Sequence, residues 1–176
     1  MAINQDIFFD GQDRQEYLER VKRYKDELEF ILCAYVLMAN HHLIMETPYA
    51  SIYKIMQRIT LTYTQYFNKK YGKVGHLFQG RYKAFLCERD EYLLSLVRYI
   101  HLNPREILIH DGVLEKYAWS SYPEYLGITN KEICEKMIIL QQFCSADLAQ
   151  SYKKFVENIT AESESLQLKD LFIELE

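Results

Sequence analysis

One short apolar segment constrains the fold of this chain more than any other. Residues 30–38 (FILCAYVLM) are rich in residue types that favour strands, and they predict a buried β-strand. Residues 42–47 follow after Asn40 and predict the returning strand of a tight hairpin.

Helical periodicity precedes and follows this predicted hairpin. Residues 13–16 (DRQE) have a capping-box pattern, which opens a helix that runs to about residue 28. A longer helix is predicted over residues 49–71, because its apolar side chains repeat at the spacing of a single helical face. Gly72 directly after it is a normal helix end.

The remaining segments complete an α+β chain. Residues 73–87 predict a loop that feeds a strand, and residues 90–102 predict a helix that stops before Pro104. Residues 131–143 and 145–159 are also predicted to be helical, with the second helix capped by its first residue, a serine. The order helix, two strands, helix, strand, helix is typical of an α+β sandwich with one layer of helices.

Charge is distributed unevenly along the chain. The formal net charge is -4, yet residues 51–105 contain ten basic and three acidic residues. The same segment contains many aromatic residues, which suits single-stranded nucleic acid, because cations pair with phosphates and rings stack on bases. A solvated helix face is the other interpretation of this pattern.

Several classes of protein are not expected. No segment approaches the ~18 uncharged apolar residues of a membrane span, and the first residues lack the pattern of a signal peptide. The four cysteines show no CxxC pairing, so neither a zinc ribbon nor a disulfide scaffold is predicted. We therefore expect a reduced, cytoplasmic protein of one domain, with or without a helical appendage.

Four segments together resemble one family of DNA-processing enzymes. They are YVLMANHHLIMETP (35–48), GHLFQGRYKA (75–84), RYIHLNPR (98–105) and YAWSSY followed by YLG (117–127). In order and spacing they resemble the REP-associated tyrosine transposases, relatives of the insertion-sequence-200-like transposases of the single-tyrosine HUH class. The similarity covers most of the chain between residues 6 and 127.

The resemblance implies a particular α+β architecture. It is a ferredoxin-like antiparallel sheet with helices on one face and its first strand missing, plus a C-terminal helical extension. The transposase-like domain is then expected over residues 1–127 and the extension over residues 128–176. The missing strand would lie beside the histidine strand, so its loss would expose an edge that a partner molecule could fill. Family members are monomers or homodimers, and a homodimer is one of the expected arrangements.

The resemblance also implies strand cleavage through a tyrosine. Such enzymes attack a phosphate of single-stranded or hairpin DNA and leave a 5′-phosphotyrosine link with a free 3′-hydroxyl. Tyr99 corresponds to the nucleophile, and Asn103 to one ligand of a divalent ion, Mg²⁺ or Mn²⁺. The spacing agrees with these roles, because residues four apart share a helix face and an amide oxygen suits a hard cation. His101 points away from that face and is expected to be structural or at the surface.

The histidine motif is one residue shorter than the family pattern, Asn-His-x-His-Leu. That pattern places two imidazoles on one face of a strand, because alternate residues share a face. Here His41 and His42 are adjacent, so a regular strand would project them to opposite faces. A β-bulge could bring both to one side; otherwise one histidine stays near the site and the other is displaced. His41, His42 and Asn103 are the predicted metal ligands.

The predicted DNA contacts follow the LFQG turn. Arg81 and Lys83 suit phosphates, and Tyr82 between them suits a base. Gln79 shapes the same surface, and Arg98, directly before the predicted nucleophile, either contacts DNA or pairs with an acid on its helix.

Three functions remain open from the sequence. The first is an active, metal-dependent tyrosine transposase that nicks and joins DNA strands. The second is a DNA-binding remnant whose catalysis is impaired by the shortened histidine motif. The third is a protein-interaction module that uses the acidic C-terminal part.

Overall fold

Two antiparallel strands, β1 (Ile31–Leu37) and β2 (His41–Glu46), form an open sheet in the computed structural model. The structure describes residues 6–39, 41–78, 82–84, 86–87, 90–108 and 113–158, with only the backbone of residues 90, 91 and 106. Helices α1 (Gly11–Leu28) and α2 (Ile52–Tyr71) precede and follow the strand pair, and α3 (Asp90–Leu102) comes next. The α+β class expected from the sequence is confirmed.

The elements after α3 are short. They are the 3₁₀ turns η1 (Asn103–Glu106) and η2 (Leu114–Lys116) and the helices α4 (Tyr122–Tyr125), α5 (Met137–Leu140) and α6 (Leu148–Glu157). The helix predicted over residues 131–143 is therefore reduced to α5. The last helix is capped by Asp147 and not by Ser145, because the Asp147 side chain accepts a hydrogen bond from the Gln150 N–H at 2.9 Å. In the described part of the chain, no helix is long and apolar enough to cross a membrane.

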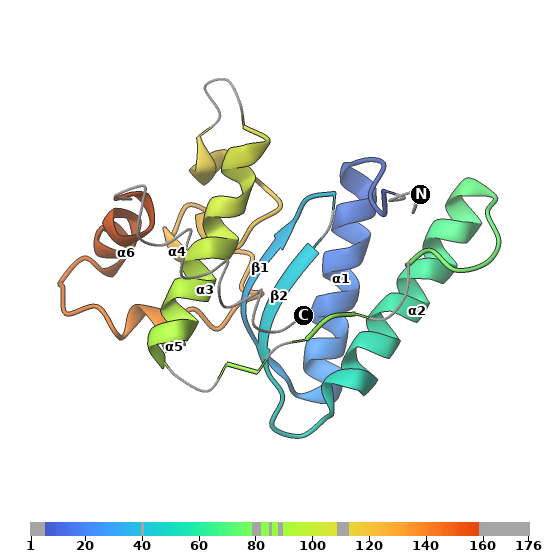
Figure 1. Cartoon of the computed structure of the whole chain (residues 1–176), viewed down its shortest axis with the longest axis horizontal. Coiled ribbons are helices and arrows are strands. Elements are labelled where there is room, and N and C mark those ends of the chain that lie inside the picture. The colour runs from blue at the N-terminus through green and yellow to red at the C-terminus, as the bar shows by residue number, and fades with distance from the viewer. Residues whose placement is uncertain are drawn as a thin grey trace.

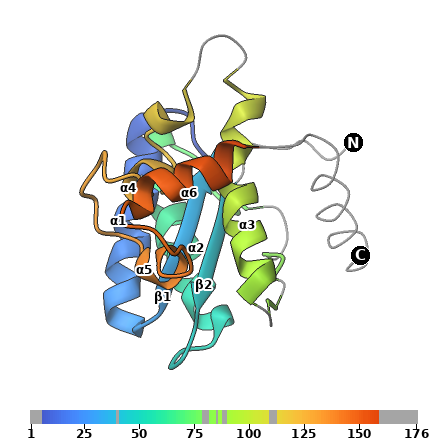
Figure 2. The ribbon, with the colours of Figure 1, turned by 90° about the vertical axis from the view of Figure 1, so that its left-hand side faces the viewer.

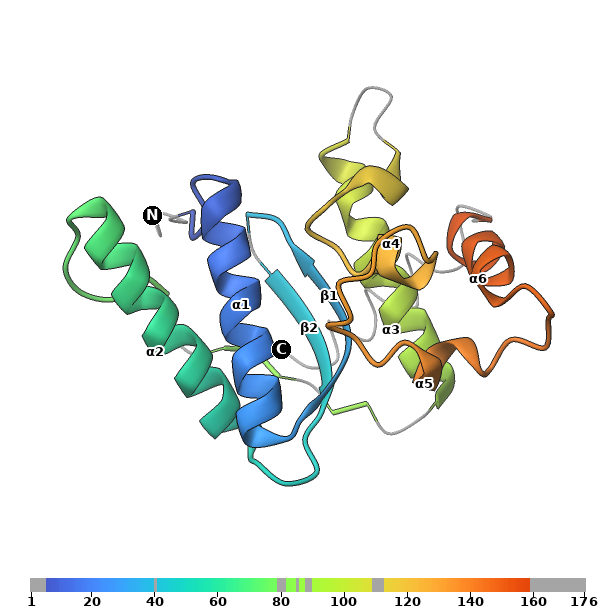
Figure 3. The same cartoon turned by 180° about the vertical axis from the view of Figure 1, so that it is seen from behind.

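The sheet lies between two groups of helices (Figure 1). On one face α1 packs on α2, and on the other face α3 contacts β1 (Figure 3). Helix α6 contacts α3 on the outer side of this second group (Figure 2). The second group is not part of the one-layer arrangement expected from the sequence. The second group packs there because β1 is apolar along its whole length, so both of its faces need to be covered.

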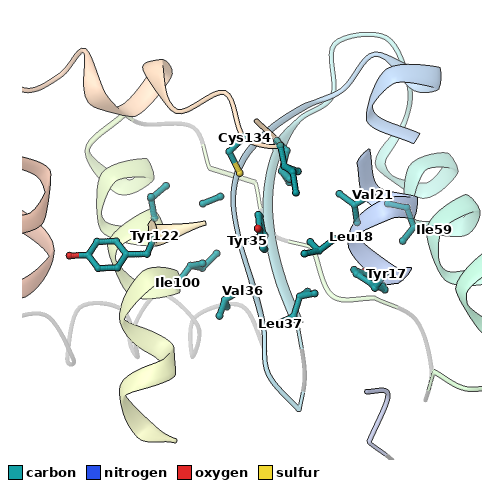
Figure 4. Close-up of a cluster of buried hydrophobic side chains, with 14 of the residues drawn as sticks. Tyr17, Leu18, Val21, Tyr35, Val36, Leu37, Ile59, Ile100, Tyr122 and Cys134 are labelled. Carbon is teal, nitrogen blue, oxygen red and sulfur yellow. The ribbon is translucent and has the colours of Figure 1, made fainter. Parts of the chain in front are cut away.

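The core consequently has two halves, one on each side of the strands. Figure 4 shows Tyr17, Leu18 and Val21 on one side and Ile100 and Tyr122 on the other, with β1 between them. All of these side chains are buried. The position of α3 is thus fixed by the same strand that anchors α1.

β1 forms hydrogen bonds along both of its edges. On one edge it pairs with β2, in a register that sets Leu37 opposite His41. On the other edge the Leu37 N–H donates to the Trp119 carbonyl at 2.8 Å, and the Ser121 N–H donates to the Tyr35 carbonyl at 3.0 Å. Residues 119–121 therefore act as a short third strand. The outer edge of β2 has no strand partner among the residues that the structure describes.

The strand expected within residues 73–87 is not found in the described portion of that segment. Positions 79–81 and 85 lie outside the described residues. Residues 82–84 and 86–87 have no regular secondary structure, and Leu86 is 85% exposed.

The N-cap of helix α1 lies three residues before the one predicted from the capping-box pattern of residues 13–16. Asp10 is the N-cap, and its side chain accepts a hydrogen bond from the Asp13 N–H at 2.8 Å. The Asp13 side chain accepts in return from the Asp10 N–H, so the capping box is formed by these two aspartates. Helix α2 is capped by Ser51 and ends at Gly72, whose φ of 61° is the left-handed conformation that favours glycine.

A buried carboxylate joins the start of α1 to the end of α2. Asp13 has no exposed surface and accepts hydrogen bonds from Lys70 Nζ at 2.8 Å, Tyr71 Oη at 2.8 Å and Tyr66 Oη at 3.2 Å. Burial alone would raise the pKa of Asp13, but the hydrogen bonds from Lys70, the Phe9 N–H and Tyr71 hold it below its usual value. Asp13 is therefore charged, and it fixes the two helices to each other.

We predict that Asp13→Asn lowers the free energy of unfolding by about 2–3 kcal/mol, because the neutral amide removes the buried charge that accepts hydrogen bonds from Lys70 and two tyrosine hydroxyls. Urea unfolding measures the loss. Asp26→Asn, an exposed change on the same helix, is the control and should change the stability by less than about 0.5 kcal/mol. Equal stability of the two variants would contradict the role given to Asp13.

Candidate active site

Tyr99 faces the sheet from α3. Its ring centroid is 6.4 Å from that of His42 on β2, with the two rings at 74° to each other. Tyr99 is partly buried, whereas its neighbours Val97 and Ile100 are buried in the core between α3 and β1. The helix is thus held by its apolar residues in a position that sets the tyrosine beside the histidine strand.

His41 lies on the opposite face of β2. Its ring is surrounded by three aromatic rings, those of Tyr17 at 4.9 Å, Phe78 at 5.9 Å and Phe8 at 6.5 Å between centroids. This is the face covered by α1 and α2. His41 therefore belongs to the aromatic core on that side and is separated from Tyr99 by the sheet.

The strand register explains why the two histidines diverge. Val36 pairs with His42 and Leu37 with His41, one after the other and without a shift. The only irregularity in the pairing of β1 with β2 lies between Leu32 and Ala34, near the other end of the strands. Consecutive residues of a regular strand project to opposite faces. Of the two arrangements considered from the sequence, the structure has the displaced histidine and not the bulge.

Both imidazoles are neutral at pH 7. Burial lowers the pKa of His41 to about 4, with a further contribution from His42. Burial also lowers the pKa of His42. A neutral imidazole is the form that ligates a metal ion or accepts a proton, so His42 is chemically suited to act beside Tyr99.

Asn103 begins the η1 turn directly after the last residue of α3. Leu102 keeps helical backbone angles (φ -83°, ψ -22°), so Asn103 lies one helical turn beyond Tyr99 as the sequence predicted. Its Nδ2 is buried and has no hydrogen-bond partner among the described residues.

The family's pair of imidazoles for one divalent ion does not fit this arrangement. An ion beside Tyr99 would have His42 and Asn103 as candidate ligands, but the ring of His41 is on the other side of the sheet. Within the described residues no group of three His, Cys, Asp or Glu side chains could hold a metal ion. The two imidazoles diverge because His41 and His42 are successive residues of a regular strand.

The predicted DNA contacts have different surroundings. Tyr82 and Lys83 are exposed, while Gln79 and Arg81 lie outside the described residues. Arg98 is only 7% exposed: its Nη2 donates to the Asn158 carbonyl at 3.0 Å, and its guanidinium lies 4.9 Å from the centroid of the Phe155 ring. Arg98 therefore connects α3 with α6 and does not lie on an open DNA surface.

His101 connects α3 with α6 and with the segment before α4. It is fully buried, with Nδ1 2.6 Å from the Tyr152 hydroxyl and Nε2 2.7 Å from Ser121 Oγ. Ser121 Oγ also accepts a hydrogen bond from the Tyr35 N–H at 3.0 Å, so the network reaches β1. The structural role expected for His101 agrees with these contacts, but the sequence did not indicate its partners, which come from α6 and the segment before α4.

A comparison with known families identifies the chain. Residues 2–103 match the family described as transposase IS200 like. This match spans more than half of the chain, and it includes the hairpin, both histidines and Tyr99. The chain belongs to the IS200-like transposase family, as the sequence motifs indicated, and its function is transposase-like. No curated protein and no solved structure gave a match.

We predict that the buried histidines make the protein less stable in mild acid. Burial lowers the pKa of His101 to about 3, whereas an unfolded histidine titrates near 6.5. Below that pH the unfolded chain binds a proton that the folded chain does not. His101 alone should therefore lower the free energy of unfolding by about 1.2 kcal/mol between pH 6 and pH 5.

Urea unfolding at several pH values measures this slope. His101→Gln should reduce it, and His76→Gln, at an exposed histidine, should leave it unchanged. Titration of the histidine ring signals of the wild-type protein by NMR checks the same point without a substitution. A His101 signal that titrates near pH 6.5 in the folded protein would contradict the prediction.

Proposed function

We propose that the chain binds single-stranded or hairpin DNA on the face formed by β2 and α3, and that Tyr99 is its nucleophile. One observation carries the proposal: in a chain of the IS200-like family, the tyrosine of the YIHLNP motif lies 6.4 Å from the ring of His42. The family supports a transposase-like reaction, and the ring contact supports this face as its location.

The proposed reaction takes place between Tyr99, His42 and one phosphate of the DNA. The phenolic oxygen of Tyr99 attacks a phosphorus atom of the strand and forms the 5′-phosphotyrosine bond. The bond from phosphorus to the 3′-oxygen breaks, and this oxygen takes up a proton from water, so the strand leaves with a free 3′-hydroxyl. His42 takes the phenolic proton, because its neutral imidazole lies beside the Tyr99 ring. Reversal of these steps joins the strands.

The opposite orientation of His41 favours a second candidate, a DNA-binding protein with weak cleavage. A metal ion polarises phosphoryl oxygens most effectively when several ligands fix it beside the nucleophile. Here the aromatic contacts of His41 keep that imidazole on the far face. We propose that DNA binding is retained, with exposed Tyr82 and Lys83 among the contacts, while cleavage is slower than with two imidazoles on one face.

The assignment of Tyr99 predicts a covalent protein–DNA adduct that depends on one hydroxyl. Wild-type protein incubated with a labelled hairpin oligonucleotide and Mn²⁺ should give an adduct that survives denaturing electrophoresis, and Tyr99→Phe should abolish it. Tyr92→Phe, which removes an exposed tyrosine hydroxyl from the same helix, is the matched control and should leave the adduct unchanged. An adduct of equal yield with Tyr99→Phe would disprove the nucleophile. Hairpin binding without any adduct would leave the second candidate.

The strand register predicts how the metal site could be restored. One isoleucine inserted between His41 and His42 should occupy the position of His41 among Phe8, Tyr17 and Phe78. It should also move His41 back by one residue, to the face of His42. We expect Mn²⁺ binding by calorimetry to tighten by at least about tenfold, because a second imidazole joins the site, and adduct formation to increase.

The control for the insertion is His41→Ile, which places the same apolar side chain in the aromatic pocket without returning an imidazole to the Tyr99 face. It should bind Mn²⁺ as the wild type does. If the insertion folds but gains no affinity over this control, the shortened motif is not what limits the site.

A further inference from the structure

The outer surface of α2 is basic and aromatic. Helix α2 lies at one side of the molecule, and α1 lies between α2 and the sheet (Figures 1 and 3). Its twenty residues include four basic residues and no acidic one. The exposed positions include Tyr53, Lys54, Arg58, Leu61 and Lys69, and we call these residues the α2 outer face.

The lysine in the first turn of α2 is not explained by helix stability. Lys54 is in the first turn after the Ser51 cap, where the partial positive charge of the helix dipole disfavours a cation. The first turn contains no acidic residue. Lys69 and Lys70 are at the C-terminal end, where the dipole favours cations. Lys54 thus imposes a local cost, which is typical of a residue that serves a contact with an anion.

The aromatic residues near the start of α2 are not explained by packing. Tyr53 is 62% exposed, and Tyr49, just before the helix, is 79% exposed. The residues that hold α2 on the protein are on its other face, where Ile55, Ile59 and Tyr63 are fully buried. Exposed rings beside cations, on a helix that itself contains no acidic residue, suit a nucleic-acid strand, since rings stack on bases and cations pair with phosphates.

We infer that the α2 outer face is a second contact surface for single-stranded DNA. Lys54, Arg58 and Lys69 pair with phosphates, and Tyr49 and Tyr53 stack on bases. Residues 53 and 69 are about 24 Å apart along the helix, from its rise of about 1.5 Å per residue, which accommodates a few nucleotides. α1 and the sheet lie between this surface and α3 (Figure 3). The strand held by α2 is therefore a flanking part of the DNA, distinct from the phosphate beside Tyr99.

The charged part of this inference is tested by fluorescence anisotropy with labelled oligo-dT of twenty nucleotides, in a Tyr99→Phe background that forms no adduct. Lys54→Ala/Arg58→Ala should weaken binding at least about fivefold. It should also reduce the slope of log K against log salt by about 1.4, since each lost phosphate contact to a single strand contributes about 0.7. The control Lys22→Ala/Lys154→Ala removes two exposed lysines on α1 and α6 and should leave both quantities unchanged. Equal weakening by the two pairs would overturn the inference.

The aromatic part has its own readout. Tyr53→Ala should weaken binding about fivefold or more, and Tyr53→Phe should preserve it, because stacking needs the ring and not the hydroxyl. Photocrosslinking with an oligonucleotide containing 5-bromouracil should label residues 49–53. Crosslinks found only outside residues 49–71, or binding of the protein to phosphatidylserine vesicles with no effect of the α2 substitutions on DNA, would overturn the inference.

Failure of the inferred α2 surface can be distinguished from failure of the proposed nucleophile, Tyr99. Adduct formation through Tyr99 with unaltered binding by the α2 variants would remove only the second surface. Weakened binding by those variants, with no adduct from the wild-type protein, would remove only the assignment of Tyr99.

Discussion

The alternation of side chains along β2 is the constraint on which the candidate site depends. His41 and His42 occupy successive positions of a regular antiparallel ladder, so one projects toward α1 and the other toward α3. Each orientation is secured by its own neighbours, since aromatic rings enclose His41 and the Tyr99 ring faces His42. β1 is apolar along its whole length, so both of its faces need cover, and the two groups of helices supply it.

Much of the fold could be predicted from sequence periodicity. The hairpin, α2 and α3 lie within a few residues of the predicted segments, because local patterns of apolar residues determine them. The misplaced capping box shows the limit of such patterns: Asp13 matched the N-cap of the box but is its third helical residue, because Asp10 supplies the cap. Residues 119–121 pair with β1 through contacts between distant parts of the chain, and no local pattern indicates them.

The site was predictable in part for similar reasons. Motif resemblance indicated Tyr99 and Asn103, and helix geometry placed them one turn apart. The sequence left a bulge and a displaced histidine as alternatives. Which of them forms depends on where the pairing of β1 with β2 shifts its register, and this shift lies between Leu32 and Ala34, away from the histidines. The orientation of Arg98 could not be predicted either: its partner Asn158 is 60 residues away and becomes a neighbour only when α6 packs on α3.

The attachment of α3 to the C-terminal part has a consequence for how mutations would be interpreted. Arg98 and His101, on either side of Tyr99 in the sequence, both bond to residues at or just beyond α6. The position of α3 on the sheet is thus set partly by residues of α6, on the outer side of α3. If Tyr99 acts as proposed, substitutions at Tyr152 and Phe155 would resemble active-site defects, although they would act by shifting α3 on the sheet.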